Sequence, residues 1–455
     1  MNEFLAIVTL VILIVLIVRT ILVWHIRAFL SPALYFGAIW ALGVLGVTIF
    51  HPVGLLYEPY PQYIDELHIL VSFTALCFLF WTKKGRKAVN DKQIQLNFTF
   101  DSVYVFFSIL LFLIALYDFI SLGGNLNMGQ ARQNVHEIQD SRSVIIGYGH
   151  TLLIPLSVYG GYKLVSFLSS GISLFSPKML FFILPLLSGL IFSVDVGGRV
   201  DVVYSFANYF LGMAFYLPLH TSVRRYKRVF VWIVLGAFMV TLFISGVANQ
   251  RDLYGKGYNT DAEIYLTEKS PVLGALYGPV SYVVASYSGY QLRRVDAVDP
   301  NQLGYGMYTF NGFINWTLPF SGLIGLGDFS IAKTFGIYYN NQETYDYQRE
   351  LYYTTHSCYI PMIKDFGFWG SLICIFFLTL ISHNAFVAIQ KRKSLEYACS
   401  LFFYILFWNY WSRSNFYGTL SSTVLMQLYG FLIIDIANLL VGKPRNRSFD
   451  YKRHI

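Results

Sequence analysis

Long apolar runs, repeated along most of the chain, are the feature that most constrains its fold. They fall at 4–24, 29–49, 67–82, 101–121, 145–168, 179–194, 200–218, 229–247, 366–383, 396–412 and 419–441. Crossing the ~30 Å hydrocarbon core of a bilayer takes about 20 helical residues. Only 13% of the 455 residues are charged, whereas a soluble domain has roughly a quarter. The pattern excludes a soluble protein and predicts an all-α, polytopic integral membrane protein with about eleven transmembrane helices.

Two further stretches without charged residues, 271–290 and 306–327, leave the number of spans open. Both are rich in Gly, Ser, Pro and Tyr. Non-helical backbone is tolerated at membrane depth only where protein or water covers it, so we expect these stretches to be re-entrant or interfacial. If both crossed the membrane, the number of spans would rise to about thirteen.

The formal net charge of +8 reflects membrane topology rather than a nucleic-acid partner. In an alternating trace of the spans, 20 of the 33 basic residues fall on one side, mostly in loops 82–98, 219–228 and 384–395 and in the tail after residue 441. Short cytoplasmic loops collect Lys and Arg, so this side is expected to be the cytoplasm. The N-terminus is then periplasmic and the C-terminus cytoplasmic, and the basic loops are expected to meet anionic membrane lipid.

The trace divides the chain into four parts. Residues 1–247 form an N-terminal bundle of about eight spans, 248–357 a large periplasmic segment, 358–441 the C-terminal spans and 442–455 a basic cytoplasmic tail. The periplasmic segment holds 15 of the 35 tyrosines. Tyrosine is enriched at membrane interfaces because its ring is apolar and its hydroxyl is wet. The same ring and hydroxyl suit the face and rim of a sugar, so composition leaves both explanations open.

Two arginines at predicted periplasmic ends of spans are candidates for catalysis. Arg199 follows two glycines and begins a new apolar window, which places a guanidinium at a helix N-terminus, where the dipole already favours an anion. Arg251 follows the end of the next window on the same side. A guanidinium matches phosphate oxygens in bidentate fashion, so both residues are candidates for phosphate binding. Alternatively, each pairs with a neighbouring aspartate and only fixes a helix end.

A histidine near the entrance of a later span is the candidate general base. His356 precedes the window 366–383, and a histidine accepts a proton near neutral pH. A hydrogen-bonded structural side chain is the plainer alternative. Asp365 is a second candidate base, although the adjacent Lys364 offers it a simple ion pair. Further residues of this face are candidates for substrate binding: Arg132, Arg293, Arg294, Arg349, Tyr353 and Tyr359.

The sequence carries no signature for a metal, a nucleotide or another cofactor. Its four cysteines fall singly, without metal-ligand or disulfide spacing. The sequence also lacks a phosphate-cradling glycine loop, a His-Glu-x-x-His pattern and a Gly-x-Ser-x-Gly pattern. An ATP-driven or sugar-nucleotide-dependent reaction is therefore disfavoured, and no cofactor is expected.

With its many spans and one dominant external segment late in the chain, the sequence resembles the Wzy-type O-antigen polymerases, which join oligosaccharide repeat units, and the related O-antigen ligases. Locally, the resemblance lies in Gly197–Arg199 before a span and in His356–Ser357 followed by Gly367 and Gly370 at a span entrance. The paired arginine and glycine loops of some polymerases are not cleanly reproduced after Arg132 or Arg349, so the family's roles are not extended to these two arginines.

The resemblance implies a GT-C-like, lipid-dependent glycosyltransferase of the bacterial inner membrane that uses neither metal nor nucleotide. The donor would be a growing glycan on undecaprenyl diphosphate, and the acceptor a single repeat unit on the same lipid, with inversion at the anomeric centre. Arg199 and Arg251 would stabilise the leaving diphosphate, and His356 or Asp365 would take the acceptor's proton. A chain-length-determining protein is a further expected partner. An O-antigen ligase, or a flippase or transporter of lipid-linked oligosaccharide, is the alternative.

Overall fold

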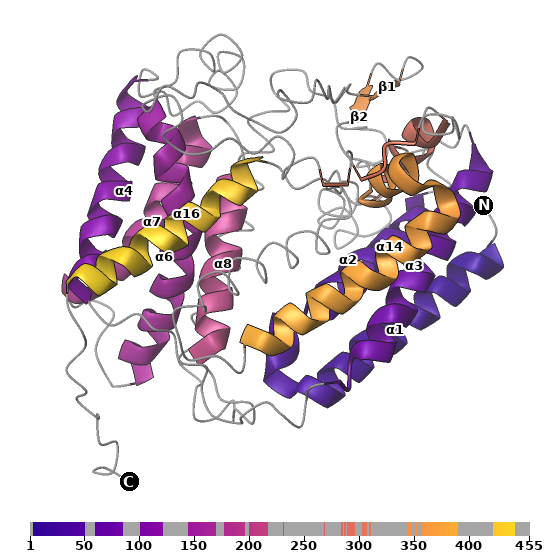
Figure 1. Ribbon diagram of the computed structural model, residues 1–455, viewed down its shortest axis with the longest axis horizontal. Coiled ribbons are helices and arrows are strands. Elements are labelled where there is room, and N and C mark those ends of the chain that lie inside the picture. Colours follow the sequence, from indigo (N-terminus) through magenta and orange to yellow (C-terminus); the bar gives the residue numbers. More distant parts are fainter. Residues whose placement is uncertain are drawn as a thin grey trace.

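The structure is a computed structural model, and the part that it describes is almost entirely helical (Figure 1). Its one β element among the described residues is a short hairpin. The described residues are 3–50, 60–84, 101–121, 144–169, 177–195, 200–216, 303–306, 309–310, 344–346, 351–353, 357–389 and 422–441, with helical residues also at 231, 268, 284, 286, 287 and 289–295.

The described helices follow the predicted apolar windows. They are α1 (Glu3–Trp24), the 3-10 helix η1 (His25–Leu30), α2 (Pro32–Phe50), α3 (Pro61–Trp81), α4 (Asp101–Ser121), α6 (Val144–Ser169), α7 (Pro177–Asp195), α8 (Val200–Tyr216), α14 (Tyr359–Ile389) and α16 (Ser422–Leu440). The hairpin strands are β1 (Thr344–Asp346) and β2 (Leu351–Tyr353). Nearly all of the predicted windows 229–247 and 396–412 lies outside the described residues.

Five of the described helices are long and apolar enough to cross a membrane. They lie at Glu3–Trp24, Pro61–Trp81, Ser102–Ser121, Thr151–Leu168 and Tyr359–Ala388. The described part is thus nearly all helical, as predicted, and by length and composition it contains helices that could span a membrane. The number of eleven spans and the GT-C-like architecture stay predictions.

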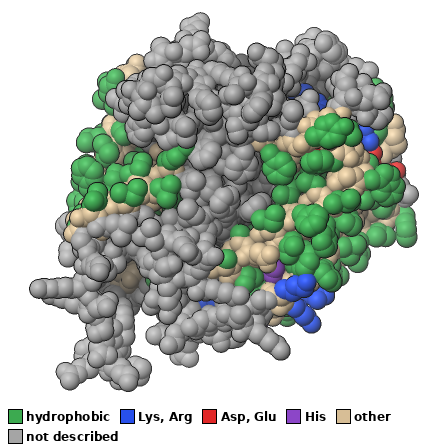
Figure 2. Space-filling view, viewed as in Figure 1, with side chains coloured by type: hydrophobic (Ala, Val, Ile, Leu, Met, Phe, Trp, Pro, Cys, Tyr) green, Lys and Arg blue, Asp and Glu red, His purple; other side chains and the backbone are tan. Residues whose placement is uncertain are grey.

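Helix α1 shows how these helices differ from those of a soluble protein. Its inner side is mostly apolar, with Leu13, Leu16 and Trp24 buried, and its outer side is apolar as well, with Ile7 and Val11 exposed. A surface helix in water carries polar residues on the side away from the core, so an apolar outer side suits a lipid-facing helix. Figure 2 shows that hydrophobic side chains cover much of the described surface on the face in view.

The described helices form two groups (Figure 1). One hydrophobic core joins α4, α6, α7, α8 and α16, and it continues to η1 and to the end of α14. The other joins α1, α2 and α3 to the start and middle of α14. In the first group, a Cβ atom on Gly161 or Gly212 would come within 1.9 Å of a carbonyl oxygen of the facing helix. Helices α6 and α8 can therefore cross only because both positions are glycine.

Helix α14 contains a break at Gly367, whose φ of 64° and ψ of −178° are not helical. A positive φ is costly for residues with a side chain, which explains the glycine. The sequence also predicts that Gly367 and Gly370 allow the close approach of a neighbouring helix or of a lipid-linked ligand. No described heavy atom lies within 4 Å of a Cβ at Gly367, and the nearest atom at Gly370 belongs to Phe366 of the same helix. Among the described residues no neighbouring helix approaches either glycine, and the approach of a ligand stays a prediction.

Candidate functional site

Polar and aromatic side chains from three distant parts of the sequence meet at the start of α3. Helical residues 284, 286, 287 and 289–295, called the Tyr290 helix below, lie against the first turns of α3, and the start of α14 adjoins them (Figure 1). We call this region the Tyr60 end of α3 and the opposite one the Lys84 end. The Tyr290 helix belongs to the predicted stretch 271–290 and to the residues that follow it.

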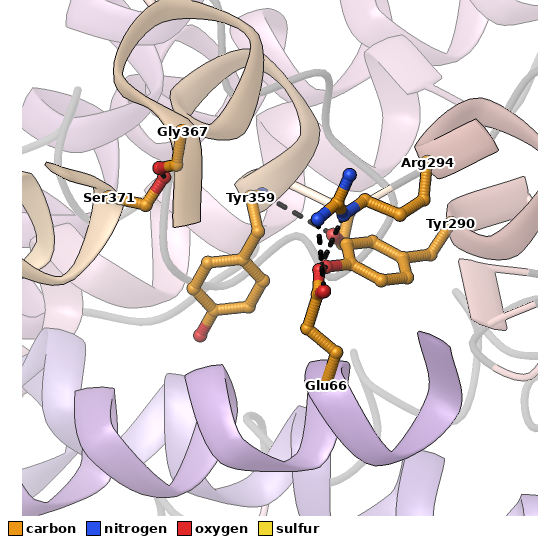
Figure 3. Close-up of polar contacts among 7 residues, drawn as sticks. Glu66, Tyr290, Arg294, Tyr359, Gly367 and Ser371 are labelled. Atoms are coloured by element: carbon orange, nitrogen blue, oxygen red, sulfur yellow. Dashed lines mark hydrogen bonds and ion pairs between the residues drawn. The ribbon is translucent and has the colours of Figure 1, made fainter. Parts of the chain in front are cut away.

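The centre of the Tyr60 end is an ion pair between Arg294 and Glu66. The Nε atom of Arg294 donates to Oε1 of Glu66 at 2.6 Å, and Nη2 donates to Oε2 at 3.0 Å. The hydroxyl of Tyr290 donates to Oε1 as well, at 2.6 Å. A bidentate, charge-assisted pair of this kind fixes both side chains. Figure 3 shows that the third guanidinium nitrogen points away from the carboxylate.

Burial and charge together determine the protonation of this cluster. The side chains of Arg294 and Glu66 are only 11% and 16% exposed. Burial lowers the pKa of the Arg294 guanidinium, but the hydrogen bonds and the charge of Glu66 outweigh this effect and raise the pKa. Burial, together with the Glu66 carboxylate, raises the pKa of Tyr290 well above its usual value. The phenol therefore stays protonated and remains a donor to Glu66.

Two tyrosines flank the ion pair at the first turn of α3. The guanidinium of Arg294 lies over the ring of Tyr63, 5.2 Å from the centroid, a cation–π contact. The ring of Tyr60 lies 5.9 Å from that of Tyr63 and is tilted by 56°. The side chain of Gln291 holds this turn in place, because its Oε1 accepts the Tyr60 backbone N–H at 3.2 Å.

Beneath the ion pair lies a layer of buried aromatic rings. Trp40 of α2 packs against Tyr287 and Tyr359, each with a centroid distance of 5.8 Å. The Tyr359 hydroxyl shares a 2.8 Å hydrogen bond with Thr74 of α3, and His68 packs edge-on against Tyr287 at 5.7 Å. Tyr359 was predicted to bind substrate, but this fully buried residue ties α14 to α3.

Asp365 anchors a turn of the predicted periplasmic segment. Its carboxylate is fully buried, and Oδ2 accepts the backbone N–H of Thr309 at 2.6 Å. The backbone of the same stretch of α14 accepts two more hydrogen bonds, from Gly304 to Lys364 and from Tyr305 to Asp365. The contact gives Asp365 a structural role in holding the turn. The geometry thus favours an anchoring role, while its catalytic role stays a prediction.

The structure places only some of the predicted site residues. Arg293 and Arg294 lie in the Tyr290 helix, where both are largely buried. Tyr353 pairs with Thr344 in the hairpin. The remaining candidates lie outside the described residues: Arg132, Arg199, Arg251, Arg349 and His356. The described residues therefore do not test whether Arg199, Arg251 and His356 lie close together, and their shared role stays a prediction.

Several residues of the Tyr60 end were not predicted as site residues from the sequence. Glu66 lies directly before the predicted window 67–82. Tyr60, Tyr63 and Tyr290 have no sequence signal beyond the general abundance of tyrosine, and Gln291 has none. One signal was available. An acidic residue beside an apolar window, together with two arginines in an otherwise uncharged stretch, indicates that the charges neutralise one another, since unpaired charges near a bilayer are costly.

Among the described residues, no three His, Cys, Asp or Glu side chains lie close enough to hold a metal ion. Arg294, Glu66 and the tyrosines instead provide hydrogen-bond donors, acceptors and ring faces at one end of an apolar bundle. No protein-family model, curated protein or solved structure matches the chain.

Proposed function

We propose that this protein is a polymerase of O-antigen or another surface polysaccharide in the bacterial inner membrane. It joins oligosaccharide repeat units carried on undecaprenyl diphosphate by inverting, metal-independent glycosyl transfer at the outer leaflet. In this proposal the Tyr60 end of α3 faces the periplasm and the Lys84 end faces the cytoplasm. The donor and the acceptor both lie in the membrane and present their glycans to the Tyr60 end.

The observation that carries the proposal is the composition of the Tyr60 end. Apolar helices with exposed Ile, Leu and Phe side chains end in a cluster of tyrosines and hydrogen-bonding side chains around Arg294 and Glu66. A substrate with a polyprenyl tail and a sugar head has the same two parts. The apolar surface suits the tail, and the rings and polar groups suit the head.

The reaction requires a base and a stabiliser of negative charge. The acceptor hydroxyl attacks the anomeric carbon of the donor, the bond to the diphosphate oxygen breaks, and its electron pair leaves with the diphosphate. Arg199 and Arg251 stabilise that charge, and His356 takes the hydroxyl proton. His356 is preferred to Asp365 because the Asp365 side chain is fully buried and holds the backbone of Thr309.

The decisive experiment is the glycan ladder of a deletion strain. Without the polymerase, cells should display lipid A-core carrying a single repeat unit, because flipping and ligation are separate steps. Loss of the single-repeat material as well would contradict the polymerase and favour the ligase or the transporter. An unchanged ladder would exclude all three.

Single substitutions test the assigned roles. Arg199→Ala and His356→Ala should each leave an inserted protein at normal abundance and remove the long chains. Lys84→Ala is the matched control, because this exposed cation lies at the opposite end of α3. Normal chain length in either site variant would remove that residue from the mechanism.

A further inference from the structure

The first turn of α3 offers an aromatic ring to the outside. Tyr60 is 37% exposed, and its backbone is fixed by Gln291, a fully buried residue that also donates to the carbonyl of Tyr287 at 3.2 Å. The ring of Tyr63 lies between Tyr60 and the guanidinium of Arg294. Tyr63 thus contacts the cation, whereas Tyr60 is the partly exposed residue of the two. Such a rigid ring gives a ligand contact area at a low cost in conformational entropy.

Two hydrogen-bonding side chains belong to the same end of α3. The Nε and Nη2 atoms of Arg294 are bound to Glu66, and the third nitrogen points away from it (Figure 3). The Gln62 side chain is exposed one position after Pro61. A guanidinium donates and an amide both donates and accepts, so neighbouring hydroxyls of one ligand would find complementary partners here.

The charges of the Tyr60 end decide which class of ligand fits. Asp65 and Glu66 equal Arg293 and Arg294 in number, so the start of α3 and the Tyr290 helix carry no net charge. Arg294 in particular is already neutralised by its bidentate partner. A phosphate brought to this pair would gain the attraction of one guanidinium and meet the repulsion of Glu66 at nearly the same distance. A neutral ligand with several hydroxyls meets no such repulsion.

We propose that Tyr60, Gln62 and Arg294 form a binding site for an uncharged sugar unit, in which the ring of Tyr60 stacks on the sugar and the free edge of Arg294 binds its hydroxyls. Glu66 and Gln291 are positioning residues, which fix Arg294 and Tyr60. The inference rests on the proposed function for the identity of the natural ligand, which is a sugar of the repeat unit. The diphosphate binds elsewhere.

Saturation-transfer NMR on the full-length protein in lipid nanodiscs tests the site. The probes are the methyl glycosides of glucose, galactose, N-acetylglucosamine and rhamnose. We expect saturation of the ring protons of at least one probe, and about fivefold weaker binding of that probe to Tyr60→Leu, the scale of one aromatic contact. Tyr60→Phe should keep the affinity. Tyr117→Leu, which removes an exposed tyrosine of α4, should keep it too.

Three results would overturn the inference: no saturation of any probe by the wild-type protein, equal affinity of Tyr60→Leu and Tyr117→Leu, or displacement of the bound glycoside by inorganic phosphate. The ladder of the deletion strain separates this failure from that of the proposed function. A collapsed ladder without glycoside binding leaves the polymerase and removes this site. Glycoside binding at Tyr60 with an unchanged ladder leaves the site and removes the polymerase.

Discussion

The two ends of α3 handle their charges in different ways. At the Tyr60 end, Glu66 and Arg294 are largely buried and held together by two hydrogen bonds. At the Lys84 end, Lys83 and Lys84 are exposed, and Lys84 lies over the rings of Trp81 and Phe80 at 4.0 and 4.6 Å. One end is neutral and ordered by pairing, whereas the other carries a surplus of positive charge. Recognition of a ligand requires side chains that are held in place by pairing, as at the Tyr60 end. A signal that orients the protein in the membrane requires only the surplus of positive charge found at the Lys84 end.

The largest expected effect is an all-or-none difference in labelling between these ends. Val295→Cys and Lys83→Cys are placed singly in a background without Cys77, Cys358, Cys374 and Cys399, since both positions are exposed. An impermeant maleimide added to spheroplasts should label position 295, and position 83 only after permeabilisation. Labelling of 83 alone in intact spheroplasts would reverse the topology, and protection of 295 would indicate that the stretch before it crosses the membrane.

Breaking the pair at the Tyr60 end should lower stability strongly. Glu66→Ala leaves the buried Arg294 guanidinium without its partner, which costs about 3 kcal/mol in comparable buried pairs. A drop in the thermal unfolding midpoint of the purified protein in detergent would report it. The double variant Glu66→Leu with Arg294→Met removes both charges and should recover most of the loss. An unchanged midpoint for Glu66→Ala would show that the pair contributes little.

Removing the anchor of the 303–310 turn should have a smaller effect. Asp365→Leu takes away the acceptor of the Thr309 N–H, and a hydrogen bond to a charged group contributes about 2 kcal/mol. Asp365→Asn keeps an acceptor oxygen and should lie between Leu and the wild type in unfolding midpoint. If Asn and Leu were equally destabilising, the negative charge rather than the hydrogen bond would be what matters at this position.

The smallest effect is expected at the Lys84 end. Lys84→Ala removes an exposed cation whose side chain contacts only the outer faces of two rings among the described residues. The free energy of unfolding should change by no more than about 0.5 kcal/mol, as is usual for a surface substitution. The unfolding midpoint should therefore stay nearly the same. A loss as large as that of Glu66→Ala would remove the contrast between the two ends.

The helices were largely predictable because each one is specified locally. Window 101–121 coincides with α4, and window 4–24 with α1. Helix α3 departs from its window, since it begins at Pro61 rather than at residue 67. The difference arises because Asp65 and Glu66 lower the local hydropathy before residue 67. Pairing with Arg294 offsets the charge of Glu66, and a sequence window contains no information about a partner so far along the chain.

The candidate site was predictable only in part. Arg294 was selected from the sequence as an external arginine, but its partner Glu66 is 228 positions away. Tyr359 was selected for substrate binding, and its fully buried hydroxyl instead meets Thr74, 285 positions away. Residue type shows that a side chain can bind a ligand. Whether a protein partner already occupies it depends on long-range packing.

The sequence by itself determined that this chain builds apolar helices. A segment in lipid must satisfy its backbone hydrogen bonds internally, so about 20 apolar residues are sufficient to specify a spanning helix. Only the tertiary structure decided which polar side chains remain available. The Tyr290 helix neutralises Glu66 and leaves Tyr60 partly exposed, and the buried carboxylate of Asp365 accepts the backbone N–H of Thr309. These outcomes depend on contacts between distant segments, whose geometry is set by packing rather than by local composition.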